Sequence, residues 1–185
     1  MNAANTYHVE TEEIISEEKI IEESKTNINA FSFLYDKYYL KIFRFIYNRV
    51  ESEEIASDIC SQVFLKALQS IKQYENRGLP YGSYLYRIAR NEINQKARKN
   101  KITKIVSLKS SDIENIAEEI EFFETDYKTK LIKLLETLNE NDMELIEMKY
   151  FEKRSYKEIS EILNKNENNL KVKVHRIIKG LKKLI

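Results

Sequence analysis

Turn-forming residues are scarce in this chain, which holds three glycines and a single proline among its 185 residues. A fold with many β-hairpins needs glycine-rich or proline-containing turns at short intervals, so this scarcity disfavours a sheet-rich architecture. Long segments rich in Leu, Ile, Lys, Glu and Asn favour helices instead. The sequence therefore predicts an all-α fold.

Apolar residues recur at spacings of three and four in two separate parts of the chain. The first part predicts three amphipathic helices between residues 31 and 97, the second of which starts after the N-cap candidate Ser52. A break at residues 76–80, which contains Gly78 and the only proline, precedes the third helix. The second part predicts four shorter helices between residues 131 and 181.

Charge is distributed in blocks along the chain. Residues 1–27 lack a firm apolar period and hold seven acids against two lysines, so we expect a mobile tail there. Residues 84–104 and 165–185 each hold seven bases against one acid, and residues 112–126 hold seven acids and no base. Two basic units with an acidic stretch between them favour two nucleic-acid contacts, and ordinary solvated helix faces explain the same charges equally well. The predicted organisation is an acidic N-terminal tail (1–27), a helical domain (28–100), an acidic linker (101–128) and a second helical domain (129–185).

The last two predicted helices have the features of a helix-turn-helix. Ser155 and Glu158 form a capping box, in which each side chain accepts a hydrogen bond from a backbone N–H at the helix start. Asn164 ends that short helix and tolerates the left-handed backbone of a tight turn, and Asn166 can cap the next helix. Because the final helix is basic, we favour a helix that binds in the major groove of DNA over an ordinary amphipathic helix with solvent-exposed lysines.

Motifs from both domains together carry a family resemblance. The motifs are Phe33-Leu34-Tyr35 with Tyr38, the helix with Asp58, Gln62 and Phe64, residues 74–81, residues 85–91, residues 150–152, residues 155–163, and Lys171 with His175-Arg176. In order and spacing they resemble the second and fourth conserved regions of extracytoplasmic-function (ECF) sigma factors. The resemblance implies two small helical domains that bind core RNA polymerase and direct promoter-specific transcription initiation. Lys153 and Asn164 stand where the family often has glycine.

The resemblance implies that the helix after Ser52 docks on a coiled coil of the largest polymerase subunit. Polar residues and one leucine lie at three-four spacing opposite the apolar side of this helix, and an exposed leucine among polar neighbours is typical of an interface. The predicted core-binding residues are Glu54, Asp58, Gln62 and Leu65.

The stretch from Tyr74 to Tyr84 resembles the loop and helix start that open the downstream promoter element. Aromatic side chains can stack on unpaired bases and basic side chains can follow the strand, although packing in the core explains Tyr84 equally well. The predicted residues for downstream contact and melting are Asn76, Arg77, Tyr81, Tyr84, Arg87, Arg90, Asn91, Asn94 and Arg98.

The final helix would read the upstream promoter element. We choose Lys171 and His175 for base edges, and the other basic residues for phosphates. The predicted upstream-contact residues are Asn168, Asn169, Lys171, Val172, Lys173, His175, Arg176 and Lys179.

Other classes of function stay open at this point. A conventional helix-turn-helix regulator with an N-terminal sensing or dimerisation domain, or a helical adaptor, would share several of these features. Nothing in the sequence resembles a metal site, a phosphate-cradling loop or a catalytic triad, so we expect a non-enzyme without cofactor. We see neither a signal peptide nor an apolar run of about 18 residues, which predicts a cytoplasmic protein without membrane insertion. The expected partners are core RNA polymerase, promoter DNA and, as a further candidate, an anti-sigma factor.

Overall fold

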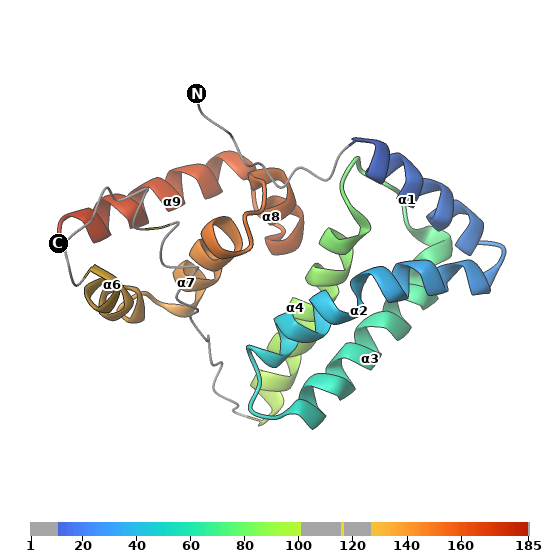
Figure 1. The fold of residues 1–185 in the computed structure, drawn as a ribbon, viewed down its shortest axis with the longest axis horizontal. Helices are drawn as coiled ribbons and strands as arrows, with labels where there is room; N and C mark the ends of the chain where they lie inside the picture. The colour runs from blue at the N-terminus through green and yellow to red at the C-terminus, as the bar shows by residue number, and fades with distance from the viewer. Residues whose placement is uncertain (1–10, 101–115, 117–126, 185) are drawn as a thin grey trace. The chain divides into compact units, whose positions relative to one another are not determined.

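The computed structural model describes residues 11–100, 116 and 127–184, and these residues form two helical domains. Every element in this part of the chain is helical, which confirms the predicted fold class (Figure 1). The first domain consists of α1 (Thr11–Ser24), η1 (Ile28–Ala30), α2 (Phe31–Tyr47), α3 (Glu53–Ser70), η2 (Ile71–Gln73) and α4 (Tyr81–Asn100). The second consists of α6 (Tyr127–Glu136), α7 (Glu140–Ile146), η3 (Glu147–Phe151), α8 (Tyr156–Leu163) and α9 (Glu167–Lys182).

Helices α2, α3 and α4 pack against one another around the core of the first domain (Figure 1). Ser52 caps α3 as predicted, because its hydroxyl accepts a hydrogen bond from the Ile55 N–H at 3.2 Å. Cys60 is buried, and burial raises the pKa of its thiol to about 11, so little reactive thiolate forms near neutral pH. The fully buried side chains of this core include Leu34, Ile42, Ile46, Ala56, Val63, Ala67, Leu85 and Ala89.

Helix α1 corrects the prediction that residues 1–27 form a tail. Residues 11–24 are helical and pack against α2 and η2. The buried side of α1 includes Glu17, Ile21 and Ser24. Two polar residues at core positions interrupt the apolar period, so the sequence pattern did not reveal this helix. Residues 1–10 of the expected tail lie outside the described residues.

The second domain places a helix-turn-helix, α8 and α9, after the helices α6 and α7. Its predicted caps are confirmed: Ser155 and Glu158 form the reciprocal capping box, and Asn166 accepts hydrogen bonds from two N–H groups of α9. Asn139 caps α7, because its side chain accepts a hydrogen bond from Asp142 N. Helix α6 ends at Glu136, earlier than the apolar spacing predicts.

The acidic linker predicted at 101–128 falls almost wholly outside the described residues. Its last two residues belong to α6, so the second domain starts slightly earlier than expected. Among the described helices, none has the length and apolarity needed to cross a membrane.

Two helical glycines should respond oppositely to alanine. A Cβ at Gly82 would lie 2.5 Å from the Tyr38 ring, whereas a Cβ at Gly180 would meet nothing within 4 Å. Gly180→Ala should therefore raise the free energy of unfolding by about 1 kcal/mol through helix propensity. Gly82→Ala should lower it by about 1–3 kcal/mol, because the packed ring has to move. Thermal unfolding followed by circular dichroism checks both variants, and stabilisation of Gly82→Ala would contradict the close packing.

Candidate functional site

One exposed row on α3 contains all four residues predicted to bind the polymerase core. Glu54, Asp58, Gln62 and Leu65 are exposed and follow one another at spacings of four, four and three, so they lie on one side of the helix. The Leu65 residue is 47% exposed and offers an apolar side chain among polar neighbours. The structure thus brings these four residues together on one surface, which we call the α3 row.

The loop before α4 makes a tight local turn. Asn76 Oδ1 accepts a hydrogen bond from Gly78 N at 2.9 Å, and Gly78 adopts a φ of 66°, which suits glycine. Arg77, between them, is exposed. The Asn76 side chain therefore shapes the loop, while Arg77 extends the basic surface that the sequence predicted there.

Tyr81 corrects the prediction that it contacts DNA. It is fully buried, its ring packs edge-on against Phe31 and Tyr74, and their centroids lie 6.4 and 4.9 Å away. A side chain in this position fills the core of the first domain and has no face available for base stacking. An aromatic residue next to a basic loop suits either role, so the sequence could not separate them.

Tyr84 begins the outer face of α4. It is partly exposed, its hydroxyl hydrogen-bonds Ser70 Oγ at 2.6 Å, and the Arg87 guanidinium carbon lies 5.2 Å from the centre of its ring. Three-four spacing continues this surface away from the buried side of α4, and Arg90 lies at its flank. We call the following residues the α4 face: Tyr84, Arg87, Asn91, Asn94 and Arg98.

Helix α9 exposes every residue that the sequence predicted for the upstream contact. Two of the cations are already engaged within the domain, since Lys171 Nζ lies 2.6 Å from Glu167 and Lys173 Nζ lies 2.5 Å from Asp142 of α7. Val172 is 49% exposed and so presents an apolar patch among these charges. We call the following residues the α9 face: Asn168, Asn169, Lys171, Val172, Lys173, His175, Arg176 and Lys179.

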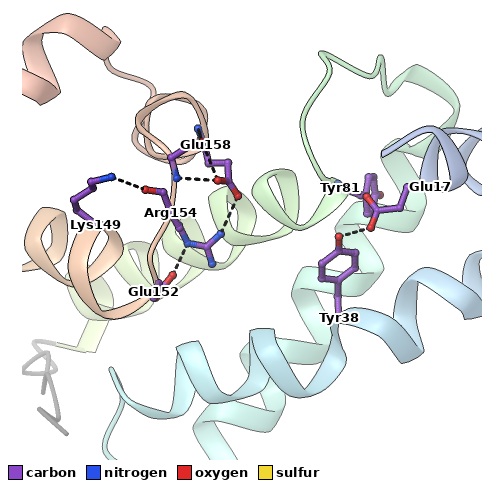
Figure 2. Close-up of polar contacts among 8 residues, drawn as sticks. Glu17, Tyr38, Tyr81, Lys149, Glu152, Arg154 and Glu158 are labelled. Carbon is purple, nitrogen blue, oxygen red and sulfur yellow. Dashed lines mark hydrogen bonds and ion pairs between the residues drawn. The ribbon is translucent and has the colours of Figure 1, made fainter. Parts of the chain in front are cut away.

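A polar network fixes the start of α8 (Figure 2). Arg154 forms ion pairs with Glu152 and, at 3.8 Å, with Glu158. Glu158 also accepts a hydrogen bond from Ser155 N at 2.9 Å, and Lys149 Nζ donates to Arg154 O at 3.4 Å. The capping carboxylate is thereby tied to η3, so the first helix of the helix-turn-helix cannot swing without breaking charged contacts.

Two residues on either side of α8 have left-handed backbones. Lys153 and Asn164 both adopt a φ of 51°, a conformation that side chains with a Cβ rarely take. Asn164 satisfies the expectation of a left-handed turn between α8 and α9. ECF sigma factors often have glycine at both positions. The observed φ values supply a physical reason for this preference, because glycine adopts a left-handed backbone without steric cost.

Glu17 on α1 is a buried residue that the sequence pattern did not single out. Its carboxylate accepts hydrogen bonds from the Tyr38 hydroxyl and, at 2.8 Å, from Tyr81 N (Figure 2). It also lies 2.5 Å from Lys37 Nζ. Burial, and then the charge of Glu17, raise the pKa of Tyr38 far above its usual value, so the hydroxyl stays protonated and donates. The available signal was Glu17 in helical register with Ile21 and Ser24.

Comparison with known proteins accounts for both domains. Residues 34–102 match the family profile of sigma-70 region 2, and residues 128–181 match that of sigma-70 region 4. The chain belongs to the ECF sigma factors of RNA polymerase. Its function is promoter-specific transcription initiation, its partners are core RNA polymerase and promoter DNA, and like its family it is not an enzyme.

Curated ECF sigma factors from two organisms resemble the chain along most of its length. It is 27% identical to BldN of Streptomyces coelicolor over 85% of the chain, although it spans only 61% of BldN. It is also 27% identical to SigM of Bacillus subtilis, over 82% of the chain and 92% of SigM. SigM is therefore matched over nearly its whole length by this ECF sigma factor.

A solved structure shares the fold of this ECF sigma factor. CnrH, solved in complex with the cytosolic domain of CnrY, superposes with a TM-score of 0.60 at 16% identity. The superposition covers 90% of the present chain and 94% of the CnrH chain. At such low identity the likeness supports the fold alone.

Lys153→Gly should stabilise the second domain. A left-handed residue with a Cβ costs about 1–2 kcal/mol, and the extra freedom of glycine in the unfolded chain cancels part of the gain, which leaves an increase of about 0.5–1 kcal/mol. Asn164→Gly is the matched control and should change stability less, because asparagine tolerates this backbone. Urea unfolding of both variants tests the expectation, and a destabilised Lys153→Gly would contradict the strain argument.

Proposed function

We propose that this ECF sigma factor divides its work among three surfaces: the α3 row binds the polymerase core, the α4 face with Arg77 contacts the opened downstream element, and the α9 face contacts the upstream element. The observation that carries this proposal is that every residue of the three surfaces is exposed or partly exposed, on elements whose opposite sides form the two cores. Tyr81 is left out of the proposal because it is buried.

Each surface has the chemistry that its proposed role needs. The α3 row combines two carboxylates, an amide and an exposed leucine, which suits a protein interface that joins polar and apolar contacts. The α4 face combines one aromatic ring with guanidinium and amide groups, which suit unpaired bases and phosphates. The α9 face is exposed helix in a helix-turn-helix, which suits the major groove.

Within the α9 face, the ion pairs favour a division of labour. Lys173 reaches Asp142 of α7 and Lys171 reaches Glu167, so using either lysine on DNA requires an existing ion pair to be exchanged. His175, Arg176 and Lys179 are exposed further along the helix. We therefore assign phosphate contacts first to Arg176 and Lys179, and keep His175 for a base edge.

Joint recognition by two small domains explains how weak contacts suffice. Each surface contributes modest affinity, and attachment to the polymerase core raises the effective concentration of both domains at one promoter. We place this activity in the cytoplasm, where the polymerase transcribes. An anti-sigma factor is a further expected partner, and the complex of CnrH with the cytosolic domain of CnrY shows such an arrangement only for CnrH.

The proposal is tested by transcription with purified components. Core RNA polymerase and fragmented genomic DNA from the source organism are incubated with and without the chain, and the 5′ ends of the transcripts are mapped. We expect new start sites that share upstream sequence elements at a constant distance. Duplex binding without core, and no new start sites with core, would favour the conventional regulator instead.

Gln62→Arg should weaken binding to the core polymerase at least tenfold, or about 1.4 kcal/mol, because a longer charged side chain enters the centre of the α3 row. Gln73→Arg is the matched control, since Gln73 is also exposed and lies beyond the end of α3 in η2. Competition for labelled core measures both affinities, and circular dichroism verifies helicity. Equal affinity of the two variants would remove the α3 row from the interface.

Lys179→Ala and His175→Ala should separate phosphate contact from base contact. Loss of a phosphate contact should reduce the slope of log affinity against log salt by about 1 and leave the ranking of promoters unchanged. Loss of a base contact should cost about 1–3 kcal/mol and relax preference at one upstream position. Holoenzyme binding to a set of upstream-element variants, at several salt concentrations, decides the assignments. Unchanged preference with His175→Ala would refute its role.

A further inference from the structure

Glu17 joins three helices of the first domain at one carboxylate. The residue is 1% exposed and reaches Lys37 of α2. It also reaches Tyr38 of α2 and the backbone of Tyr81 in α4 (Figure 2). A buried carboxylate is costly unless it is paired and hydrogen-bonded, and Glu17 has partners for both oxygens. Its helix, α1, precedes the residues that match sigma-70 region 2, which begin at residue 34.

The contact with Tyr81 N acts as a cap supplied from a distant helix. Tyr81 is the first residue of α4, and N–H groups in the first turn have no acceptor within their own helix. A negative charge there is also favoured by the helix dipole. Elsewhere in the described chain, such caps come from a residue next to the helix, but here the acceptor lies 64 residues away in sequence.

The same junction holds the loop proposed to contact opened DNA. The loop ends at Tyr81, and the Tyr74 ring at its start packs 4.9 Å from the rings of both Tyr81 and Tyr84. Gly82 follows at a close approach to Tyr38, so the start of α4 is seated tightly on α2. Both ends of the loop, and Tyr84 at the head of the α4 face, therefore depend on the position in which Glu17 holds the helix start.

We infer that Glu17 is a positioning residue for promoter opening: by capping α4 from α1 it holds the 74–80 loop and Tyr84 in the geometry that captures unpaired bases. The inference rests on the proposed role of the α4 face. Opening a duplex needs a preordered binding site for the unstacked bases. If the loop is flexible, part of the binding free energy is lost in ordering it. Template that is already open needs this help far less.

The test compares duplex and premelted templates. Holoenzyme with Glu17→Gln is given a promoter recovered by the transcription experiment, either fully paired or with an unpaired bubble at the start site. The amide keeps the size of the side chain but removes the charge and one acceptor, so we expect about tenfold fewer open complexes on duplex by permanganate reactivity. The thymines of the bubble react with permanganate without protein, so complexes on the bubble template are measured by transcript yield instead. There we expect less than a twofold change, and core affinity should also change less than about twofold.

Glu18→Gln is the matched control, because Glu18 is the exposed neighbour of Glu17 on the same helix, and it should behave like the unsubstituted chain on both templates. If Glu17→Gln does not fold, Tyr38→Phe replaces it: this variant removes one donor to the carboxylate and keeps the cap on Tyr81. It should show a smaller defect, again confined to duplex.

Each outcome decides the inference. A duplex-specific loss supports positioning. An equal loss on both templates, or no loss on duplex, overturns it and leaves Glu17 a purely structural residue. If the unsubstituted chain gives no promoter-specific transcript on either template, the proposed function itself fails and the inference falls with it.

Discussion

Helix starts carry N–H groups without acceptors, and in a chain of many short helices their satisfaction decides where each helix begins. Four described helices solve this locally, with Ser52, Asn139, Ser155 and Asn166 placed directly before the first turn. Helix α4 solves it through Glu17, brought from α1 by tertiary packing. Among the helix starts with a side-chain cap in the described residues, the start of the helix with the proposed melting surface therefore depends on the folded domain as a whole.

This difference explains how much of the fold the sequence could predict. Local caps and unbroken apolar periods are visible in one dimension, so α2, α3, α8 and α9 were predicted with their caps where these exist. Helix α1 was not predicted, because the polar residues Glu17 and Ser24 occupy buried positions and interrupt the apolar period. A buried polar residue is recognisable only when its partners are known, and the partners of Glu17 come from two other helices.

The exposure of the proposed interaction surfaces was predictable to a similar degree. An exposed face is the complement of a buried one, so the α3 row, the α4 face and the α9 face follow from apolar spacing. Tyr81 could not be assigned this way, since a tyrosine suits both core and surface, and the structure places it in the core. Nor could the sequence show that Asp142 of α7 engages Lys173 of α9, because this ion pair depends on tertiary packing.

Charge placement also bears on how the free chain meets DNA. The net charge is only +1, and exposed acids line α1 in the same domain as the basic α4 face. Beyond about 8 Å, the Debye length at physiological salt, duplex experiences mainly the screened sum of these charges, so long-range attraction is weak. The basic faces act only at contact distance. Binding then requires that something else bring the chain to the promoter, and attachment to the polymerase core meets this requirement. The α3 row proposed for this attachment is acidic, so it adds no affinity for DNA elsewhere.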